Sequence, residues 1–303
     1  MTSGSLQGRT VVIVGAGPGF GHTLALRAAA QGASVVVAAR TASRVEDIAD
    51  AVRRDDDVRR AGGTAIAAPV DATDPDSVRA LRETVEGHAD AVHGLVYSAF
   101  AVPSMKPLAR TDHAQISAGI DLSVLGALRT TQEFTPLLEA GAAADDATHV
   151  AGATHATHAT ASRPAAASRP AAASRPATSS VVMMASAVIH HSRERYAGYK
   201  VAKTALVALG HSLATELGPR GIRVNTVAPG YIYGDTLKAY FESLATKYGG
   251  TGEDVYAHTA EKTDLRRLPD EAEIVDPVLF LLSDAASAVT GQTLTVDCGE
   301  FHT

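Results

Sequence analysis

Short apolar runs, several of them rich in β-branched residues, alternate along the chain with longer stretches of helical character. The first run, Thr10–Val14, leads through a glycine cluster into the alanine-rich segment His22–Gln31, after which Gly32 ends the helix. Runs that are apolar on both faces are typical of parallel strands covered by helices on both sides. The predicted strands are Thr10–Val14, Ser34–Ala39, Ala65–Val70, Gly94–Ser98, Ser180–Met184, Arg223–Ala228 and Thr293–Val296. The alternation predicts an α/β fold with a doubly wound parallel sheet and right-handed crossovers.

One stretch, residues 140–179, interrupts this pattern. It contains Ala-Thr-His steps and then a Ser-Arg-Pro-Ala-Ala-Ala repeat that starts at Ser162. Regularly spaced prolines prevent a stable helix, and small side chains offer little surface to bury. We therefore predict a single domain in two parts, 1–139 and 180–303, separated by a disordered low-complexity insert. Metal binding by its histidines (His149, His155 and His158) is the less favoured alternative because the insert offers no ordered frame, and no metal site is predicted.

The insert connects a helix that is predicted to end near Leu138 to the strand that begins at Ser180. Helix-to-strand connections lie at the amino-terminal edge of a parallel sheet, whereas ligands bind at the carboxyl-terminal edge. We expect deletion of Ala142–Pro176 to leave turnover intact, because the deleted residues lie far from the chemistry. A large loss of turnover in a deletion variant that still folds would contradict this placement.

The bulk composition excludes several classes of protein. The chain has 303 residues, 46% of them apolar and 20% charged, and its formal net charge is −6. This balance gives no electrostatic reason to expect nucleic acid or an anionic membrane as partner. The single cysteine, Cys298, excludes an intramolecular disulfide and favours a reducing compartment. Met1–Thr10 does not have the pattern of a signal peptide, and no stretch approaches the roughly 18 apolar residues of a membrane span, so we expect a cytoplasmic protein.

The glycine cluster lies between the first strand and the first helix, where dinucleotides bind in such folds. Gly15 can adopt backbone angles that side chains disfavour, and Gly19 and Gly21 let the chain approach a pyrophosphate closely. The amino terminus of the helix that follows these glycines offers free N–H groups and a positive electrostatic potential to the phosphates. Together with Pro18 and Phe20, these glycines are the predicted pyrophosphate site.

The end of the second strand bears on the choice of cofactor. An acidic residue there would accept hydrogen bonds from the ribose of NAD, but the sequence reads Val37-Ala-Ala-Arg40. Arg40, with Arg44 one helical turn further, offers a charged fork to a 2′-phosphate. We therefore predict NADP rather than NAD. The alternative is that Arg40 is an ordinary solvated surface arginine.

Tyr199 and Lys203 are four residues apart in a segment of helical periodicity, Tyr199–Leu217, so both side chains are predicted on one helix face. A free phenol has a pKa near 10, and an ammonium one turn away is expected to lower the pKa of Tyr199. Ser186 follows an apolar strand, so its hydroxyl is expected at the carboxyl-terminal edge of the sheet, where it can bind a substrate oxygen.

These residues, with two later segments, resemble the short-chain dehydrogenase/reductase family in its shorter, single-domain form. The resemblance covers the chain apart from the insert. It rests on Gly15-x3-Gly19-x-Gly21, Ser186, Tyr199-Lys-Val-Ala-Lys203, Ile222-Arg-Val-Asn-Thr-Val-Ala-Pro-Gly230 and the tail from Arg267-Leu-Pro to Thr290-Gly-Gln-Thr-Leu-Thr-Val-Asp297.

The resemblance implies a Rossmann fold and a role for each matching residue. Tyr199 would be the general acid/base, Lys203 would hold the ribose and lower the pKa of the tyrosine, and Ser186 would bind the reacting oxygen. At the cofactor, Asp71 and Ala72 would meet the adenine. Ile232 would offer its backbone to the nicotinamide carboxamide. The resemblance also implies a homotetramer or homodimer built through the helices Ala114–Leu138 and Tyr199–Leu217.

The sequence departs from the family pattern at several positions. Val14 precedes the first glycine in place of the usual threonine, and Tyr97-Ser-Ala-Phe100 stands where Asn-Asn-Ala-Gly is usual. Ser123 aligns with the asparagine that supports a water relay to the lysine. A serine or an extra water can serve in that relay, so Ser123 is kept as a candidate catalytic residue.

The predicted function is hydride transfer between NADP(H) and a small carbonyl compound or secondary alcohol. The alternative is a non-catalytic NADP(H)-binding sensor or scaffold, although such a protein has no need of Ser186. A segment at about 231–268 is expected to cover the pocket as a lid. Its many aromatic residues either line the pocket for a ring-bearing substrate or pack the lid onto the body, and the second interpretation is slightly favoured. His190 and His191 lie between Ser186 and Tyr199 and can reach the pocket, although a place at the surface is the favoured interpretation.

Overall fold

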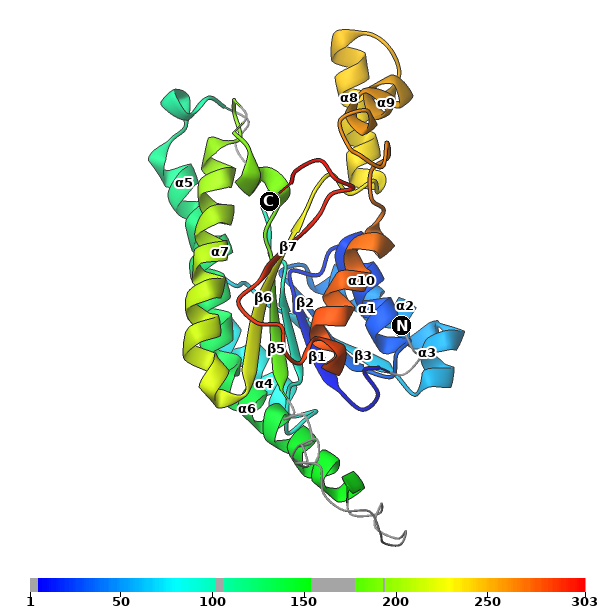
Figure 1. The fold of residues 1–303 in the computed structure, drawn as a ribbon, viewed down its shortest axis with the longest axis vertical. Helices are drawn as coiled ribbons and strands as arrows, with labels where there is room; N and C mark the ends of the chain where they lie inside the picture. Colours follow the sequence, from blue (N-terminus) through cyan, green and yellow to red (C-terminus); the bar gives the residue numbers. More distant parts are fainter. Residues whose placement is uncertain (1–4, 102–105, 154–177, 193, 303) are drawn as a thin grey trace, which may run out of the picture.

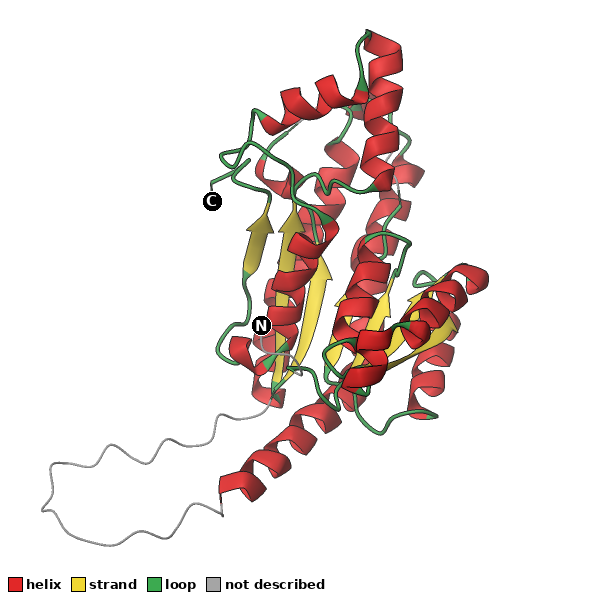
Figure 2. Cartoon of the chain, turned by 90° about the vertical axis from the view of Figure 1, so that its right-hand side faces the viewer, coloured by secondary structure: helices red, strands yellow, loops and turns green. Residues whose placement is uncertain are grey.

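The computed structural model describes residues 5–101, 106–153, 178–192 and 194–302. Across these ranges seven strands form one parallel sheet in the order β3-β2-β1-β4-β5-β6-β7, seen as a layer of arrows in Figure 2. The strands are β1 (Thr10–Val14), β2 (Ser34–Ala39), β3 (Thr64–Pro69), β4 (Gly94–Tyr97), β5 (Ser179–Met184), β6 (Ile222–Pro229) and β7 (Thr293–Val296). Each lies within one residue of its predicted bounds, and the predicted doubly wound parallel sheet is confirmed.

Helices cover both faces of the sheet, which explains why its strands are largely apolar on both faces (Figure 1). Alternate residues of β1 enter different cores: Val11 and Ile13 pack on one side, and Val12 and Val14 on the other. The first core is covered by α1 (Phe20–Ala29), α2 (Ala42–Arg54), α3 (Asp56–Ala61) and α10 (Glu271–Leu282). The second is covered by α4 (Pro75–Glu86), α6 (Gly126–Ala153) and α7 (Ala197–Leu217).

The order of the strands reverses between β1 and β4, which are neighbours in the sheet. Chain connections diverge at such a point and leave a crevice at the carboxyl ends of the strands. Gly15, directly after β1, has a φ of 93°, and a Cβ there would lie 2.2 Å from the backbone nitrogen of Ala99, directly beyond β4. Only glycine fits this turn, so the two strand ends meet closely at the floor of the crevice.

A pair of helices, α8 (Asp235–Tyr248) and α9 (Gly252–Ala260), stands beyond the carboxyl-terminal edge of the sheet (Figure 1). Part of its aromatic content packs within the pair. The rings of Tyr233 and Tyr256 lie 4.5 Å apart, and Phe241 is buried. This packing agrees with the interpretation that was slightly favoured for the aromatic residues, but it does not account for all of them, as the cavity described below demonstrates.

The predicted bounds of the insert are wrong at both ends. Helix α6 continues to Ala153 instead of ending near Leu138, and Ser179 is already part of β5. The reason is local: the segment directly after Leu138 is rich in alanine, the best helix former, and its first proline is Pro164. The repeat itself, together with His155, His158 and the side chain of His149, lies outside the described residues. Helix α6 leaves the sheet at the edge opposite α8 and α9, where the connection was expected (Figure 1).

The described residues include neither a membrane-spanning helix nor a cluster of metal ligands. No helix in these ranges is long and apolar enough to cross a membrane. No group of three or more His, Cys, Asp or Glu side chains within the same ranges is arranged to hold a metal ion.

The helix α5 (His113–Ile120) leads through a π-helical turn, Asp121–Leu125, into α6, and this turn reaches the site described next.

Candidate active site

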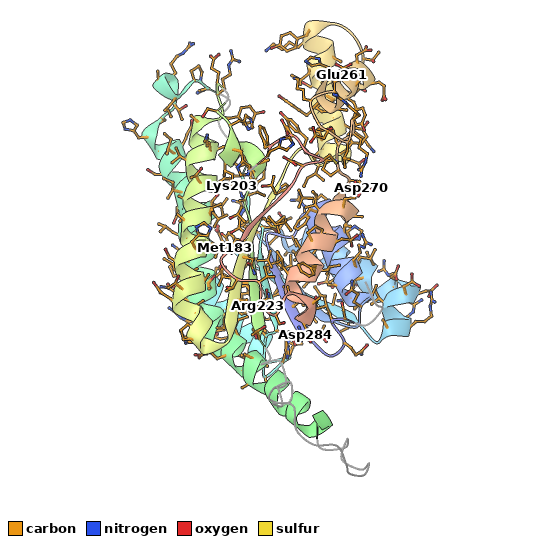
Figure 3. All side chains as sticks on the ribbon, viewed as in Figure 1. Met183, Lys203, Arg223, Glu261, Asp270 and Asp284 are labelled. Carbon is orange, nitrogen blue, oxygen red and sulfur yellow. The ribbon has the colours of Figure 1, made fainter. Side chains whose placement is uncertain are left out.

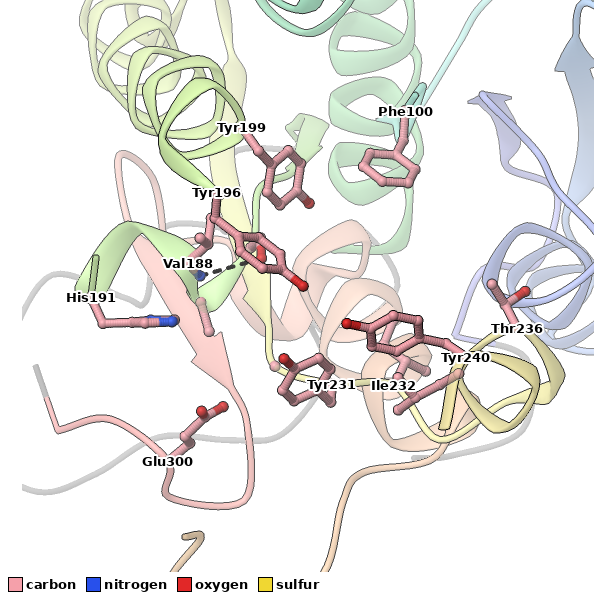
Figure 4. Close-up of a pocket in the computed structure, with 14 residues that line it drawn as sticks. Phe100, Val188, His191, Tyr196, Tyr199, Tyr231, Ile232, Thr236, Tyr240 and Glu300 are labelled. Carbon is pink, nitrogen blue, oxygen red and sulfur yellow. Dashed lines mark hydrogen bonds between the residues drawn. The ribbon is translucent and has the colours of Figure 1, made fainter. Parts of the chain in front are cut away.

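Ser186 and Tyr199 meet at the carboxyl-terminal edge of the sheet. Ser186 follows β5 and begins the short 3-10 helix Ala187–His190, where its hydroxyl accepts a hydrogen bond of 3.3 Å from the backbone of Val188 (Figure 4). Tyr199 lies in the first turn of α7, where its phenol is close enough to the Ser186 hydroxyl for that hydroxyl to lower the phenol's pKa. Both side chains line a cavity of about 460 Å³. Two hydroxyl groups are therefore presented side by side to anything bound there.

Lys203 lies one helical turn beyond Tyr199, on the side of α7 that faces the sheet (Figure 3). Its side chain is buried, with a relative exposure of 3%. Its Nζ donates a hydrogen bond of 2.7 Å to the backbone carbonyl of Met184 and lies 5.8 Å from the ring centroid of Tyr199. The four-residue spacing thus brings the amine beneath the phenol ring, while its hydrogen bond goes to the end of β5.

Burial dominates the electrostatics of this pair. Desolvation raises the pKa of the Tyr199 phenol to about 12, and the nearby Ser186 hydroxyl offsets this only in part. Desolvation also lowers the pKa of the Lys203 amine to about 8. The prediction that Lys203 lowers the pKa of Tyr199 is therefore wrong for the protein alone. The physical reason is that spacing along a helix carries no information about how far the phenol is removed from water.

The lowered pKa of Lys203 predicts how stability depends on pH. The unfolded amine has the ordinary pKa of 10.5 and the folded one a pKa of about 8, so between these values the unfolded state binds more protons. The contribution of Lys203 to the free energy of unfolding therefore rises with pH in this window, and it is lowest and independent of pH below about pH 8, where both states bind the proton. Relative to Lys203→Met, the wild-type protein should gain about 2 kcal/mol between roughly pH 7 and pH 10 in urea denaturation. Parallel pH dependence of the two proteins would contradict the buried amine.

A second cavity, of about 300 Å³, lies at the crevice between β1 and β4. Its lining includes Gly15, Phe20, Gly21, Arg40 and Ala72, all of which were predicted to bind cofactor. A Cβ at Gly21 would lie 2.6 Å from Cα of Ala16, so the turn closes tightly onto the start of α1. Helix α1 has no side-chain cap and no acidic residue in its first turn, which leaves its amino terminus suited to an anion. These residues fit the diphosphate of a dinucleotide.

Arg40 and Arg44 form the outer part of this second cavity. Both are exposed, and neither is engaged in an ion pair with another described residue. Arg40 is close enough to contribute to the lowered pKa of the Asp71 carboxyl, although hydrogen bonds from the Thr73 hydroxyl and backbone are the larger causes. The cavity therefore ends in two exposed guanidinium groups.

Other predicted residues border these cavities. Pro18 and Gly19 line a neighbouring cavity near the start of α10. There the carboxylate of Glu271, which the sequence analysis did not single out, lies against Gly19 and accepts a hydrogen bond of 2.9 Å from the Thr23 hydroxyl. Ile232 lines the cavity that contains Tyr199.

Ser123 lies in the π-helical turn that joins α5 to α6, where it is buried. It lines a further cavity, of about 440 Å³, that Tyr199 also borders. Irregular turns of this kind are frequent at functional sites because they redirect a helix face. The structure thus places Ser123 and Tyr199 on one cavity, with no direct hydrogen bond between them among the described contacts.

Sequence reasoning missed several residues of the first cavity. Phe100 lines both this cavity and the second one, and its ring packs edge-on against Tyr199 at 5.5 Å (Figure 4). Tyr196 and Glu300 also line the first cavity. His191, expected at the surface, lines it as well and stacks on Phe301 at 4.6 Å. The one available signal was that Phe100 replaces the glycine of the family pattern.

Comparison with known families identifies the protein. A family model described as short chain dehydrogenase matches residues 9–147, and one described as enoyl-(acyl carrier protein) reductase matches residues 146–300. The chain belongs to the short-chain dehydrogenase/reductase family. It is therefore an oxidoreductase of a fold that binds nicotinamide cofactors.

Relatives of this protein align with it over almost their full length. The short chain dehydrogenase/reductase astE of Aspergillus oryzae is 29% identical over 300 residues, covering 97% of this chain and 95% of the relative. L-sorbose reductase from Gluconobacter frateurii, solved with NADPH and L-sorbose, has a TM-score of 0.80 at 22% identity, with full coverage of both chains. A 7α-hydroxysteroid dehydrogenase solved with NADH and 7-oxo glycochenodeoxycholic acid has a TM-score of 0.74 at 26% identity, covering 99% of this chain and 98% of its own.

Proposed function

We propose that the protein transfers a hydride between NADP(H) and a small carbonyl compound or secondary alcohol. The observation that carries this proposal is the placement of Ser186 and Tyr199 at a cavity that shares a wall, Phe100, with the dinucleotide cavity, with the buried Lys203 packed against the Tyr199 ring. Acid/base and orienting groups therefore stand beside the place to which a cofactor would extend.

Each residue of the group has a distinct part in this proposal. The Tyr199 phenol, protonated at neutral pH because burial raises its pKa to about 12, gives a proton to the carbonyl oxygen and takes it back from the alcohol. Ser186 donates a hydrogen bond that orients the same oxygen. Lys203 holds the cofactor ribose, and Ser123 supports a water relay from the shared cavity. Bound NADP(H) supplies or accepts the hydride.

The preference for NADP comes from Arg40 and Arg44, which lie exposed at the outer part of the dinucleotide cavity. A guanidinium fork is suited to a 2′-phosphate. One similar structure holds NADPH and another NADH, so relatives do not decide this choice. Within the same proposal Gly15, Gly19, Gly21, Pro18 and Phe20 receive the diphosphate. At the two ends of the cofactor, Asp71 and Ala72 meet the adenine, and Ile232 meets the carboxamide.

A non-catalytic NADP(H) sensor is the second candidate, favoured by the raised pKa of Tyr199 and by Ser123 in the relay position. The two functions differ in turnover. NADPH oxidation should be measured with a panel of ketones, aldehydes and quinones. Turnover of any of them that Tyr199→Phe abolishes supports the enzyme. Tight NADPH binding with no turnover across the panel supports the sensor.

Within the same proposal, the protein works in the cytoplasm as a homo-oligomer. A single cysteine, Cys298, suits the reducing cytoplasm. A homotetramer or homodimer through α5, α6 and α7 is supported by two large apolar side chains that are exposed there: Leu125, in the π-helical turn between α5 and α6, at 45%, and Val201, on α7, at 46%. Size-exclusion chromatography with light scattering tests the assembly.

A further inference from the structure

We infer that the substrate is a bulky, largely apolar ring ketone or the corresponding alcohol, and not an open-chain polyol or keto sugar. This inference rests on the proposed function and names the substrate class of the same site. The observation behind it is the make-up of the cavity that holds Ser186 and Tyr199.

Aromatic side chains from separate elements form the walls of this cavity. Phe100 follows β4, Tyr196 precedes α7, Tyr231 follows β6 and Tyr240 lies on α8 (Figure 4). Figure 4 shows their rings around one space, with Phe100 close to Tyr199. Aliphatic side chains complete the walls: Val188, Ile232 and Leu237. Flat apolar rings bind well in such a space because they displace water from both partners and stack on the aromatic faces.

Most of the surface that lines the cavity is apolar. Apart from Ser186 and Tyr199, the other polar contributors are His191, Thr236, Glu300 and the hydroxyls of the remaining tyrosines. A polyol carries a hydroxyl on nearly every carbon, and each hydroxyl that leaves water without a hydrogen-bond partner weakens binding. Ser186 and Tyr199 serve the oxygen that reacts, whereas most of the lining that the rest of a polyol would meet is apolar.

The size of the cavity excludes very small substrates as its best ligands. A volume of about 460 Å³ lies in the range of roughly 300–1,000 Å³ typical of sites for drug-sized molecules. A ketone of three or four carbons would touch Ser186 and Tyr199 but leave most of the aromatic wall in contact with water. Two fused rings fill much more of the space, and each methylene group that they bury there favours binding.

The decisive comparison uses three ketones of different character: 2-decalone, 2-butanone and L-sorbose. We expect kcat/KM for 2-decalone, measured with NADPH and with NADH, to exceed the values for the other two by about a hundredfold. Tyr240→Ala should lower kcat/KM for 2-decalone by about tenfold, mainly by raising KM. The same variant should keep kcat/KM for 2-butanone within about twofold of the wild-type value. Leu237→Ala, on the same helix and cavity wall, provides a second variant should Tyr240→Ala fail to fold.

Tyr248→Ala is the matched control. It removes a tyrosine from the same helix, but this side chain is 73% exposed and does not line the cavity, so all three values should stay as in wild type. A value for L-sorbose equal to or above that for 2-decalone would overturn the inference and leave the proposed function standing. An equal loss of kcat/KM for all three ketones in Tyr240→Ala would also overturn the inference and leave the proposed function standing.

Absence of turnover with every ketone and both cofactors would count against the proposed function instead. Isothermal titration calorimetry of wild type and Tyr240→Ala with 2-decalone and L-sorbose then still decides the inference. Binding of 2-decalone that Tyr240→Ala weakens, with no binding of L-sorbose, supports it. Failure of 2-decalone to bind wild type refutes it.

Discussion

Tyr199→Phe should lower kcat for ketone reduction by about a thousandfold, within the range that general acid catalysis contributes. The substitution removes one hydroxyl and keeps the ring, so the edge-on contact with Phe100 and the packing over Lys203 are preserved. NADPH affinity, measured by fluorescence titration, should change by less than about threefold, because the lost group acts on the reacting oxygen.

The pH dependence gives this prediction a second readout. Alcohol oxidation needs the phenolate, and burial raises the pKa of Tyr199 to about 12 in the protein alone. Oxidation by wild type should therefore still be rising with pH at alkaline pH, and the residual rate of Tyr199→Phe should lose this dependence.

Tyr196→Phe is the matched control, because Tyr196 lines the same cavity three residues earlier and has no assigned part in proton transfer. Its kcat should remain within about threefold of wild type. A Tyr199→Phe enzyme that keeps more than a tenth of wild-type kcat would show that another group, or water, transfers the proton.

Arg40→Ala should lower kcat/KM for NADPH by about a hundredfold and leave that for NADH nearly unchanged, because a charge-assisted hydrogen bond is worth about 1.5–3 kcal/mol. The expected loss is specific to the 2′-phosphate, which NADH lacks. Arg40→Asp should go further and reverse the preference, since its carboxylate repels the phosphate and accepts hydrogen bonds from the free ribose. Both cofactors should be compared with the same ketone.

Arg44→Ala should show the same selectivity with a smaller loss, about tenfold, since Arg44 lines the same outer part of the cavity one turn further along. Arg54→Ala controls for net charge, because Arg54 is an exposed arginine of the same helix that pairs with Asp50. If wild type has a higher kcat/KM for NADH than for NADPH, and Arg40→Ala leaves this ratio unchanged, NADP is refuted as the cofactor.

The local sequence pattern was sufficient to predict the strands of the sheet and the glycine turn after β1. Strands buried on both faces need apolar residues at every position, so β1 and its neighbours are legible as continuous runs. The turn at Gly15 needs a positive φ and leaves no room for a Cβ beside Ala99, a requirement that only glycine meets. Composition was less reliable for the insert, because alanine favours a helix wherever proline is absent, and α6 extends to Ala153.

The chain alone thus determined the parallel sheet, the crevice for a dinucleotide and the side-by-side placement of Tyr199 and Lys203, because each follows from continuous apolar runs, from the helical repeat of 3.6 residues or from a single backbone angle. Only the tertiary structure decided that burial raises the pKa of Tyr199, that Phe100 separates the two cavities and that Tyr231 and Tyr240 line one of them. Desolvation and cavity shape depend on segments far apart in the chain, and no local pattern records how these segments meet.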